Sequence, residues 1–416
     1  MDYFAAALTG VPGVGARRLR ALLTCFQSAE QVWRATEKEL YASHTLPESV
    51  IQKLISYRRK TDIARIQEDM RRVGVQCVTC FESNYPMLLG QTNNPPAVLF
   101  YKGHLPEGNR IVSIVGSRKA TPYGVNVSYQ LAKELAAHGV TIVSGGARGI
   151  DTAAHNGALA SGGATIVVAA SGLDYVYPQE NRKLFKAVCE HGGAVVSEYP
   201  LGVRPCGRQF PARNRIIAGM SCGVIVVEAA ERSGSLITSD FALEEGRDVF
   251  AVPGSIFSSL SKGTNRLLRK GAICVTCSVE ILQEYNWEIT EIPQPGHADV
   301  LEPDEEWVYR FCSTGSMVTE EEILEQSGFS IPRLKLLLVK LQCKGKIREV
   351  RNGVFCGDMN FRASCERICE GTTDNILFEC ANIPSGGPRG HNPSYQGITG
   401  YACIGRRPFY MVFFLF

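Results

Sequence analysis

Short apolar runs alternate with helical patterns between Ile111 and Leu282, and this alternation constrains the fold more than any other feature. Seven such runs, rich in Val, Ile and Ala, occupy residues 111–115, 140–143, 164–170, 194–196, 224–227, 249–252 and 273–275. Near-continuous apolar strands separated by helices are typical of a parallel sheet that is covered on both faces. The sequence therefore predicts an α/β fold built on a Rossmann-like, doubly wound parallel sheet.

Small residues and cations follow two of these strands. The first strand ends in Gly116-Ser117-Arg118, and the second leads into Gly145-Gly146-Ala147-Arg148. Backbone N–H groups and cations at the carboxyl ends of parallel strands are suited to binding phosphate, and glycine lets the backbone approach it closely. The two loops together predict a pocket that reads phosphate.

A third segment adds cations and an aromatic ring. Arg213 and Arg215 flank Asn214 on a helix that is expected to begin after Pro211, and Phe210 precedes this helix. An aromatic ring beside cations offers a stacking surface for a nucleic-acid base. An ordinary surface or helix-end ion pair remains the alternative for each arginine.

The regions on either side of the predicted sheet differ from it. Residues 1–70 read as short helices, in which the glycine turn 10–15 and Arg17, Arg18 and Arg20 are similar to a SAM-like or helix-hairpin-helix-like domain. That pattern is compatible both with phosphate binding and with a small bundle whose glycines only make the turn. Residues 71–290 form the extended Rossmann-like domain, in which 73–102 supplies a lead-in strand and a linker.

The remainder of the chain divides into three parts. Residues 291–304 carry three prolines and suit a linker, and 305–356 predict three helices and a hairpin, the pattern of a winged helix. Residues 357–416 contain no lysine and are expected to have no fold of their own. Truncation at Cys356 should then leave stability and binding intact, and a cooperative loss of melting temperature would contradict this hypothesis.

Composition limits the classes of protein that remain. The 44 Lys and Arg residues against 41 Asp and Glu give a net charge of only +3, so polyanion binding requires a local patch. No stretch approaches the ~18 consecutive apolar residues that a membrane span needs. The N-terminus, which has Asp2, shows no cationic segment followed by an apolar core, so we expect no targeting signal there. Fifteen scattered cysteines favour reduced thiols. We expect a soluble, cytoplasmic protein.

Two cysteine pairs have the spacing of half a zinc site. Cys77 and Cys80 lie in one β-like run, and Cys274 and Cys277 lie in another. Zinc knuckles need a turn at this place, so buried strand cysteines are the preferred interpretation. The sequence predicts no metal and no cofactor.

Several acidic residues and one histidine leave an enzymatic alternative open. Asp151 and His155 are four residues apart on a predicted helix and share a face, although Asp151 also suits a helix cap or dipole partner. Glu198 and Glu228 follow strands, where they would orient the arginines or act as an acid–base pair. The alternative is a nucleotide-processing enzyme, similar to a phosphoribohydrolase, that uses Glu228 on a ribose.

Seven motifs in a fixed order resemble the DNA-processing protein A family, also called DprA or Smf. They are IVGSRKATPYG, IVSGGARGIDTAAH, SGLDYVYPQENRKL, FPARNRIIAGMS, VVEAAERSGSLITSDFALEEGR, FAVPGS and GTNRLLRKGA, and they span about residues 105–285. The resemblance implies a non-catalytic protein that binds single-stranded DNA and loads a RecA-type recombinase in natural transformation and recombination. It also implies a homodimer.

The resemblance assigns the DNA-binding role residue by residue. The residues that it implies are Arg118, Gly145, Gly146, Arg148, Arg182, Lys183, Phe210, Arg213 and Arg215. The predicted DNA-binding site also includes Gly116, Ser117, Arg208 and Asn214. The two cysteine pairs and the segment after the winged helix depart from the family's pattern, and neither touches these motifs.

Overall fold

A computed structural model describes residues 2–289, 301–313, 318–343, 346–351, 353–357, 402–403 and 408–409. The chain divides into two compact units, residues 1–302 and 303–416. The hypothesis about residues 357–416 lies almost wholly outside the described residues, which there include only Gly357 and the short pair β13 (Ala402–Cys403) and β14 (Pro408–Phe409).

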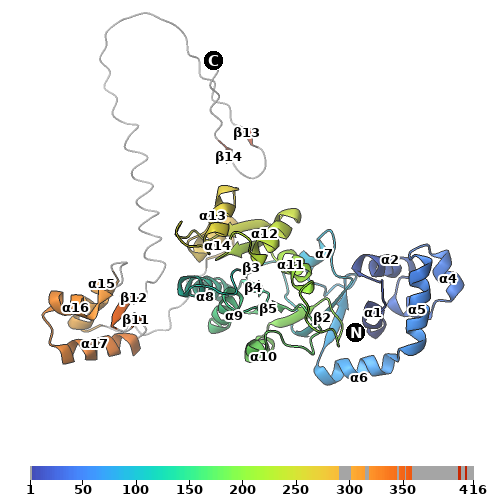
Figure 1. The fold of residues 1–416 in the computed structure, drawn as a ribbon, viewed down its shortest axis with the longest axis horizontal. Helices are drawn as coiled ribbons and strands as arrows, with labels where there is room; N and C mark the ends of the chain where they lie inside the picture. The colour runs from blue at the N-terminus through green and yellow to red at the C-terminus, as the bar shows by residue number, and fades with distance from the viewer. Residues whose placement is uncertain are drawn as a thin grey trace, which may run out of the picture. The chain divides into compact units, whose positions relative to one another are not determined.

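Six helices open the first unit (Figure 1). They are α1 (Tyr3–Thr9), α2 (Ala16–Phe26), α3 (Ala29–Arg34), α4 (Glu37–Ala42), α5 (Glu48–Lys60) and α6 (Ile63–Val73). Side-chain caps fix several helix starts, because the side chains of Asp2, Ser28 and Asp62 each accept a backbone N–H of the first turn. Thr36 and Glu39 form a capping box at α4.

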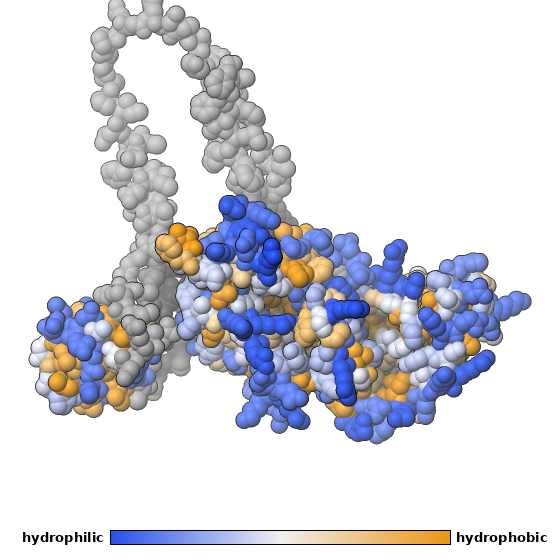
Figure 2. Space-filling view, viewed as in Figure 1, coloured by the Kyte–Doolittle hydropathy of each residue, from blue (hydrophilic) through white to orange (hydrophobic). Residues whose placement is uncertain are grey.

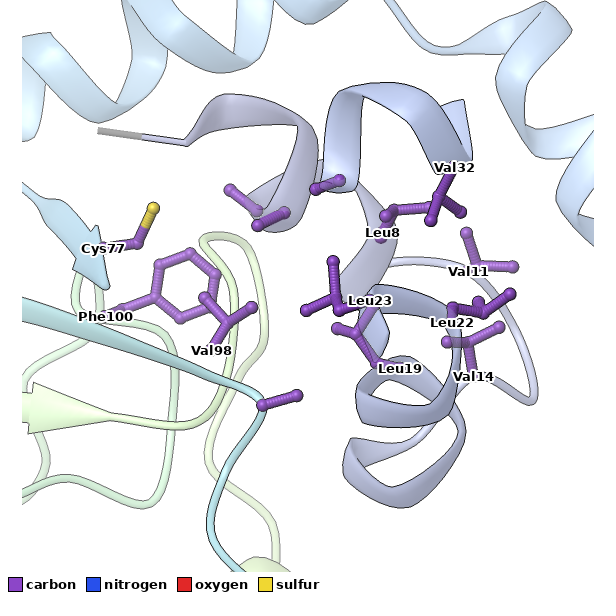
Figure 3. Close-up of a cluster of buried hydrophobic side chains, with 14 of the residues drawn as sticks. Leu8, Val11, Val14, Leu19, Leu22, Leu23, Val32, Cys77, Val98 and Phe100 are labelled. Atoms are coloured by element: carbon purple, nitrogen blue, oxygen red, sulfur yellow. The ribbon is translucent and has the colours of Figure 1, made fainter. Parts of the chain in front are cut away.

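The N-terminal helices share a hydrophobic core with the edge of the sheet. Figure 3 shows Leu19 and Leu23 of α2 facing the side where Val98 and Phe100 lie. Phe100 is 1 % exposed and belongs to strand β2 (Val98–Gly103). This continuous apolar contact places the N-terminal helices and the sheet in one compact unit.

The central sheet has nine strands in the order β1-β2-β6-β5-β4-β3-β7-β8-β9. Besides β2, the strands are β1 (Gln76–Thr79), β3 (Ile111–Val115), β4 (Thr141–Ser144), β5 (Thr165–Val168), β6 (Ala194–Ser197), β7 (Gly223–Val226), β8 (Asp248–Ala251) and β9 (Ile273–Cys274). The seven strands from β3 to β9 pair in parallel, as the alternation of strands and helices predicts. An α/β fold with a large, mostly parallel sheet is confirmed.

The segment 73–102 corrects one expectation. It contributes two strands rather than one, and β1 pairs antiparallel with β2, which pairs antiparallel with β6. The part read as a linker, with the turn at Asn93-Asn94-Pro95-Pro96, therefore lies between two strands of the same sheet. In β2, which lies between β1 and β6, the last three residues are only partly buried, so the apolar pattern covers only its first half.

Helices cover both faces of the sheet. They are α7 (Met87–Gly90), α8 (Pro122–Ala137), α9 (Ile150–Ala160), α10 (Arg182–Glu190), α11 (Gln209–Gly219), α12 (Gly234–Glu244), α13 (Lys262–Arg269) and α14 (Ser278–Glu284), with a 3-10 turn at Gln179–Asn181. Along β3, Val112 and Ile114 join the core beneath α8 and α9, whereas Ile111 and Val115 join the core that contains residues of α11 and α12. This period of two explains why β3 is apolar throughout.

Strand order changes direction at β3. From β3 the chain moves to β4, β5 and β6 on one side, and it then returns to place β7 on the other side. In open α/β sheets, ligands bind outside the carboxyl ends of the strands at such a switch point. A ligand-binding site is therefore expected at the loops after β3 and β7.

Among the described residues of the second unit are three helices, a three-stranded sheet and the short pair β13–β14. Its helices are α15 (Pro303–Cys312), α16 (Glu320–Ser327) and α17 (Ile331–Cys343), and its strands are β10 (Val318–Thr319), β11 (Ile347–Arg351) and β12 (Val354–Gly357). The antiparallel order is β10-β12-β11. Leu334, Leu337 and Leu341 of α17 are buried, whereas Leu336 is 49 % exposed. Most of the leucines of this helix therefore pack into the hydrophobic core of the second unit.

The cysteine pairs are only partly buried. Cys77 and Cys277 are buried, Cys80 is intermediate and Cys274 is exposed, and all four are free thiols. The expectation of buried strand cysteines is therefore wrong for Cys274, which lies on the edge strand β9. No helix among the described residues is both long and apolar enough to cross a membrane.

Candidate nucleic-acid interface

A cavity of about 650 Å³ opens at the switch point of the sheet. The loop after β3 contributes Gly116, Ser117, Arg118 and Lys119 to its lining, and the region after β7 contributes Ala230, Ser233 and Gly234. The helix α11 closes it with Phe210, Arg213 and Asn214. The structure thus brings together residues from the loops that the sequence singled out. On the face in Figure 2, hydrophilic side chains project from this unit between smaller apolar areas.

Arg118 and two aromatic rings form a cluster of contacts at the rim of this cavity. The guanidinium carbon of Arg118 lies 5.0 Å from the centroid of the Phe210 ring, within the range of a cation–π contact. The Phe210 ring lies 5.5 Å from that of Tyr177 at an interplanar angle of 51°. Tyr177 is 46 % exposed, so an aromatic face remains open to solvent. These three residues also line an adjoining small hollow.

Sequence reasoning missed Tyr177. It lies within the motif SGLDYVYPQENRKL, beside a cis peptide bond to Pro178, but no periodicity marks it as a stacking residue. Only the tertiary structure places its ring against Phe210, 33 residues along the chain. The available signal was an aromatic residue in a loop next to the predicted cations.

Arg148 lies at the rim of the same hollow. It forms an ion pair with Glu180, and the two side chains are 60 % and 61 % exposed. The hydrogen bond from Arg148 raises its pKa and lowers that of Glu180. Exposed pairs of this kind contribute only about 0–1 kcal/mol, so a phosphate can replace Glu180 at little cost.

Arg213 has a different environment from Arg118. Its side chain is buried, at 4 % exposure, and its Nη1 donates hydrogen bonds to the carbonyl oxygens of Gly145, at 2.7 Å, and Val168. Burial lowers the pKa of Arg213 to about 10, so the guanidinium keeps its proton at neutral pH. These contacts favour a role in holding the loop over a direct contact with a phosphate.

Asp151 accepts a backbone hydrogen bond from the glycine loop that was expected to bind phosphate. The backbone N–H of Ala147 donates to Asp151 Oδ2 at 3.3 Å, and the buried carboxylate also interacts with Arg213. Burial raises the pKa of Asp151, while Arg213 opposes this rise. The helix cap itself is Gly149, so Asp151 is a residue of the first turn rather than the cap.

The glycines of these loops are required by packing. A Cβ on Gly145 would lie 2.6 Å from Arg213 Nη2 and 2.8 Å from Asp151 Oδ2. A Cβ on Gly116 would lie 2.6 Å from Ile150. Gly146 has a positive φ of +63°, and its α-carbon faces the Phe185 ring. The space that a larger side chain would need is already filled by protein atoms, so these residues shape the loops from within.

Arg182 and Lys183 line another cavity, of about 940 Å³. This cavity also contains Lys102 and Lys186, together with the acidic residues Asp174 and Glu190. Arg208 is exposed at the start of α11, and α11 begins at Gln209, with Pro211 inside its first turn, rather than after Pro211. Proline is tolerated there because the first N–H groups of a helix have no partner within it.

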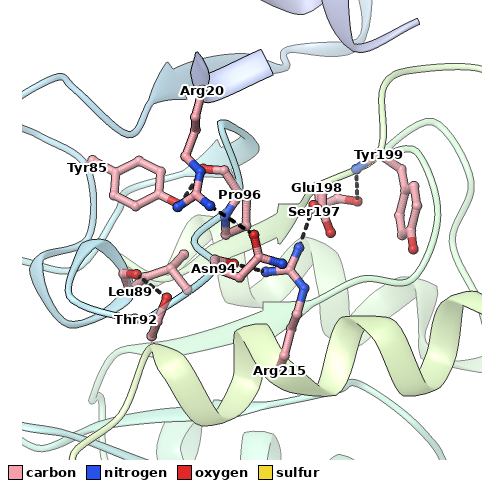
Figure 4. A network of polar contacts seen from close by, with 10 residues as sticks. All are labelled: Arg20, Tyr85, Leu89, Thr92, Asn94, Pro96, Ser197, Glu198, Tyr199 and Arg215. Carbon is pink, nitrogen blue, oxygen red and sulfur yellow. Dashed lines mark hydrogen bonds and ion pairs between the residues drawn. The ribbon is translucent and has the colours of Figure 1, made fainter. Parts of the chain in front are cut away.

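Arg215 extends from α11 toward Asn94 (Figure 4) and lines neither the cavity of about 650 Å³ nor the small hollow beside it. Its Nη2 pairs with Glu198 Oε1 at 2.5 Å, and its Nη1 donates to the carbonyl oxygen of Asn94 at 2.7 Å. Arg20 of α2 donates to Asn94 Oδ1 at 3.1 Å. The site residues predicted from sequence therefore fall into three groups rather than one.

The candidate catalytic residues are held in structural contacts. Glu228 is buried and accepts hydrogen bonds from the backbone N–H and the hydroxyl of Thr121, at 2.9 and 2.5 Å, so that it anchors the start of α8. Glu198 and Glu228 follow β6 and β7, which are four strand positions apart, or about 19 Å at ~4.8 Å per strand. They cannot act as an acid–base pair.

His155 is buried and uncharged. Its Nδ1 lies 2.7 Å from the hydroxyl of Thr165, which itself donates to the carbonyl oxygen of Ile142, so Nδ1 must carry the proton. Burial lowers the pKa of His155 to about 3. No group of three or more His, Cys, Asp or Glu side chains that could hold a metal ion occurs among the described residues.

Comparison with known proteins identifies relatives over the same region. The family model described as DNA recombination-mediator protein A matches residues 76–286. Protein Smf of Escherichia coli is 40% identical over 276 residues, which are 65% of this chain and 74% of the relative.

Two solved structures extend this comparison. The structure of DNA processing protein A from Streptococcus pneumoniae superimposes with a TM-score of 0.58 at 34% identity and covers 70% of this chain and 99% of its own. That of Helicobacter pylori, described for its single-stranded DNA binding mode, has a TM-score of 0.45 at 31% identity and covers 51% of this chain and 98% of its own. The family model spans half of the sequence, and the chain therefore belongs to the DNA recombination-mediator protein A family.

Proposed function

We propose that this protein binds single-stranded DNA in the cavity of about 650 Å³ outside the carboxyl ends of β3 and β7, which we call the crevice, and does so without catalysing a reaction. The observation that carries the proposal is the exposed Arg118 guanidinium stacked over Phe210 at the rim of the crevice. Within the described residues Arg118 makes no hydrogen bond or ion pair, so its five N–H donors are available to a phosphate.

The two aromatic rings favour a single strand over a duplex. Phe210 and Tyr177 offer ring faces, and only unpaired bases can leave their stack to lie on such faces. The ion pair between Arg148 and Glu180 opens at little cost and adds a second cation beside the rings. We assign phosphate contacts to Arg118 and Arg148, and base stacking to Phe210 and Tyr177.

The remaining predicted site residues receive supporting roles in this proposal. Arg213, Gly145 and Gly146 hold the shape of the loop, and Gly116 lets it pack on α9. Asn214 and Ser117 line the crevice. Arg182, Lys183 and Arg208 would contact the strand beyond it, because they are exposed cations outside the crevice. Nucleotide turnover is disfavoured because Glu228, Asp151 and His155 are all occupied by internal contacts.

We further propose that the protein passes the bound strand to a RecA-type recombinase in DNA uptake and recombination, as a cytoplasmic homodimer. The description of the family as recombination mediators supports this role. In the same proposal, residues 1–70 form a SAM-like or helix-hairpin-helix-like domain, 71–290 the DNA-binding domain and 305–356 a winged helix joined by the linker 291–304. The three helices and small sheet of the second unit support the last assignment.

Fluorescence anisotropy of a labelled oligonucleotide of about 20 nucleotides tests the binding proposal. We expect binding that is strand-selective, that weakens as salt rises and that Arg118→Ala reduces, since counterion release scales with the phosphates neutralised. A duplex of the same sequence is the control ligand. Absence of binding, or unchanged binding by Arg118→Ala, would refute the assignment and make nucleotide turnover the next assay.

The mediator role needs a separate measurement. RecA filament assembly on a strand already coated by single-strand-binding protein should accelerate when this protein is added. Arg118→Ala should abolish the acceleration while leaving assembly on bare DNA unchanged. If the protein binds DNA but assembly is not accelerated, the binding proposal survives and the recombinase partner is wrong.

A further inference from the structure

A third cavity, of about 680 Å³, lies between the N-terminal helices and α11. Its lining comes from the glycine turn before α2, from α2 itself and from the sheet region: Gly13, Gly15, Ala16, Arg17, Arg18, Ala21, Thr45, Asn94, Glu198 and Arg215. All of these residues belong to the first compact unit. The cavity is within the range of about 300–1,000 Å³ that is typical of ligand sites.

The charge of this cavity is positive. Arg215 and Glu198 pair at 2.5 Å and are 18 % and 20 % exposed, so their charges offset each other. Arg17 and Arg18 are exposed and add two further cations, whereas Glu198 is the only acidic lining residue in the described part of the chain. Arg18 donates one hydrogen bond to the carbonyl oxygen of Gly13 at 2.7 Å, which leaves its other N–H groups available.

The turn at Asn94 links the two sides of the cavity by holding Arg20 and Arg215 (Figure 4). Arg20 binds the Asn94 side chain and Arg215 binds its backbone carbonyl, so one residue joins α2 to α11. Gly15 at the start of α2 makes no side-chain cap, so the positive end of the helix dipole adds to the charge of the two arginines.

Helix α11 borders both this cavity and the crevice. Phe210 belongs to the crevice and Arg215 to the third cavity, and five residues of helix advance only about 7.5 Å along the axis. The same five residues turn the side chain by about 140°, so the two sites lie on different sides of one helix. A flexible polyanion bound at one site is therefore close to the other.

We propose that the third cavity binds backbone phosphates of the same DNA strand that occupies the crevice, through Arg17 and Arg18. The inference rests on the proposed function and extends it, because it predicts a binding footprint longer than the crevice. A net charge of only +3 gives the whole molecule little general attraction for DNA, so local cavities with excess cations must supply the affinity.

The test compares oligothymidylates of two lengths, about 6 and about 20 nucleotides, by fluorescence anisotropy. The variant Arg17→Ala/Arg18→Ala should bind the short strand like wild type and bind the long strand about tenfold more weakly. Its salt dependence on the long strand should fall by about 1.4 in log–log slope, at ~0.7 for each phosphate that the variant no longer neutralises. Arg59→Ala/Lys60→Ala removes two exposed cations of α5 outside the cavity and should change neither value.

Each other outcome identifies what fails. If wild type binds neither length, the proposed function itself is wrong. If wild type binds both lengths and the cavity variant keeps full affinity for the long strand, the third cavity is not a DNA site. Equal loss at both lengths, or equal loss in the control variant, would also overturn the inference. Thermal melting of both variants should match that of wild type, because all four substituted side chains are exposed.

Discussion

The guanidinium carbon of Arg118 lies 5.0 Å from the centre of the Phe210 ring, so a residue of the loop after β3 caps a residue of α11. This contact orders two groups that would otherwise sample many rotamers. When a nucleotide binds, its base and its phosphate therefore contact side chains that are already close to their bound positions.

Phe210→Ala should weaken binding of a 20-nucleotide strand by a factor of about 5–150, the equivalent of ~1–3 kcal/mol for one base–aromatic stack. Tyr177→Ala should have an effect in the same direction. Anisotropy titration at fixed salt measures both. Phe257→Ala is the matched control, because Phe257 is 93 % exposed and does not line the crevice. A similar loss in Phe257→Ala would mean that general surface aromaticity drives the binding.

Arg213→Met should destabilise the protein by about 3–5 kcal/mol, because it leaves Asp151 buried without its opposing charge and the carbonyl of Gly145 without its donor. Denaturant unfolding followed by circular dichroism measures the loss. Adding Asp151→Asn should restore part of it. Arg148→Ala, which removes only an exposed ion pair, should change stability by less than about 1 kcal/mol. Full stability of Arg213→Met would contradict the structural role that we assign to this arginine.

Gly145→Ala should also destabilise the protein, because the new methyl group would lie 2.6 Å from Arg213 Nη2. Overpacking of this kind typically costs about 1–3 kcal/mol. Gly207→Ala provides the comparison, since a Cβ there meets no atom within 4 Å. If the two variants melt at the same temperature, the loop has room that the structure does not show.

Stability should fall on acidification between pH 6.5 and 3 because of His155. Its pKa is lowered to about 3 in the folded protein, so within this window the unfolded chain binds a proton that the folded chain excludes. The loss amounts to ~1.4 kcal/mol for each pH unit below the unfolded pKa of ~6.5. Stability is fully present above that pH.

Denaturant unfolding at pH 7.5 and 5.5, compared between wild type and His155→Gln, measures this contribution. The difference between the two pH values should shrink in the variant, whatever its absolute stability. His104→Gln replaces an exposed histidine and should leave the pH dependence unchanged. An unchanged dependence in His155→Gln would show that other groups cause the acid sensitivity.

The sequence by itself determined the central fold. Continuous apolar strands such as Ile111–Val115, separated by capped helices, have few alternatives to a parallel sheet, because both faces of each strand must be buried. The motifs around Arg118 and Phe210 were also visible in the sequence, and the structure places both at one crevice.

Only the tertiary structure determined the environment of each arginine of the predicted site. Arg118, Arg213 and Arg215 look alike in sequence, yet one is exposed over a ring, one is buried against Asp151 and one pairs with Glu198. Tyr177 and β2 were missed for the same reason. Burial and pairing depend on neighbours that are distant in the chain, whereas local periodicity reports only which face of an element is apolar.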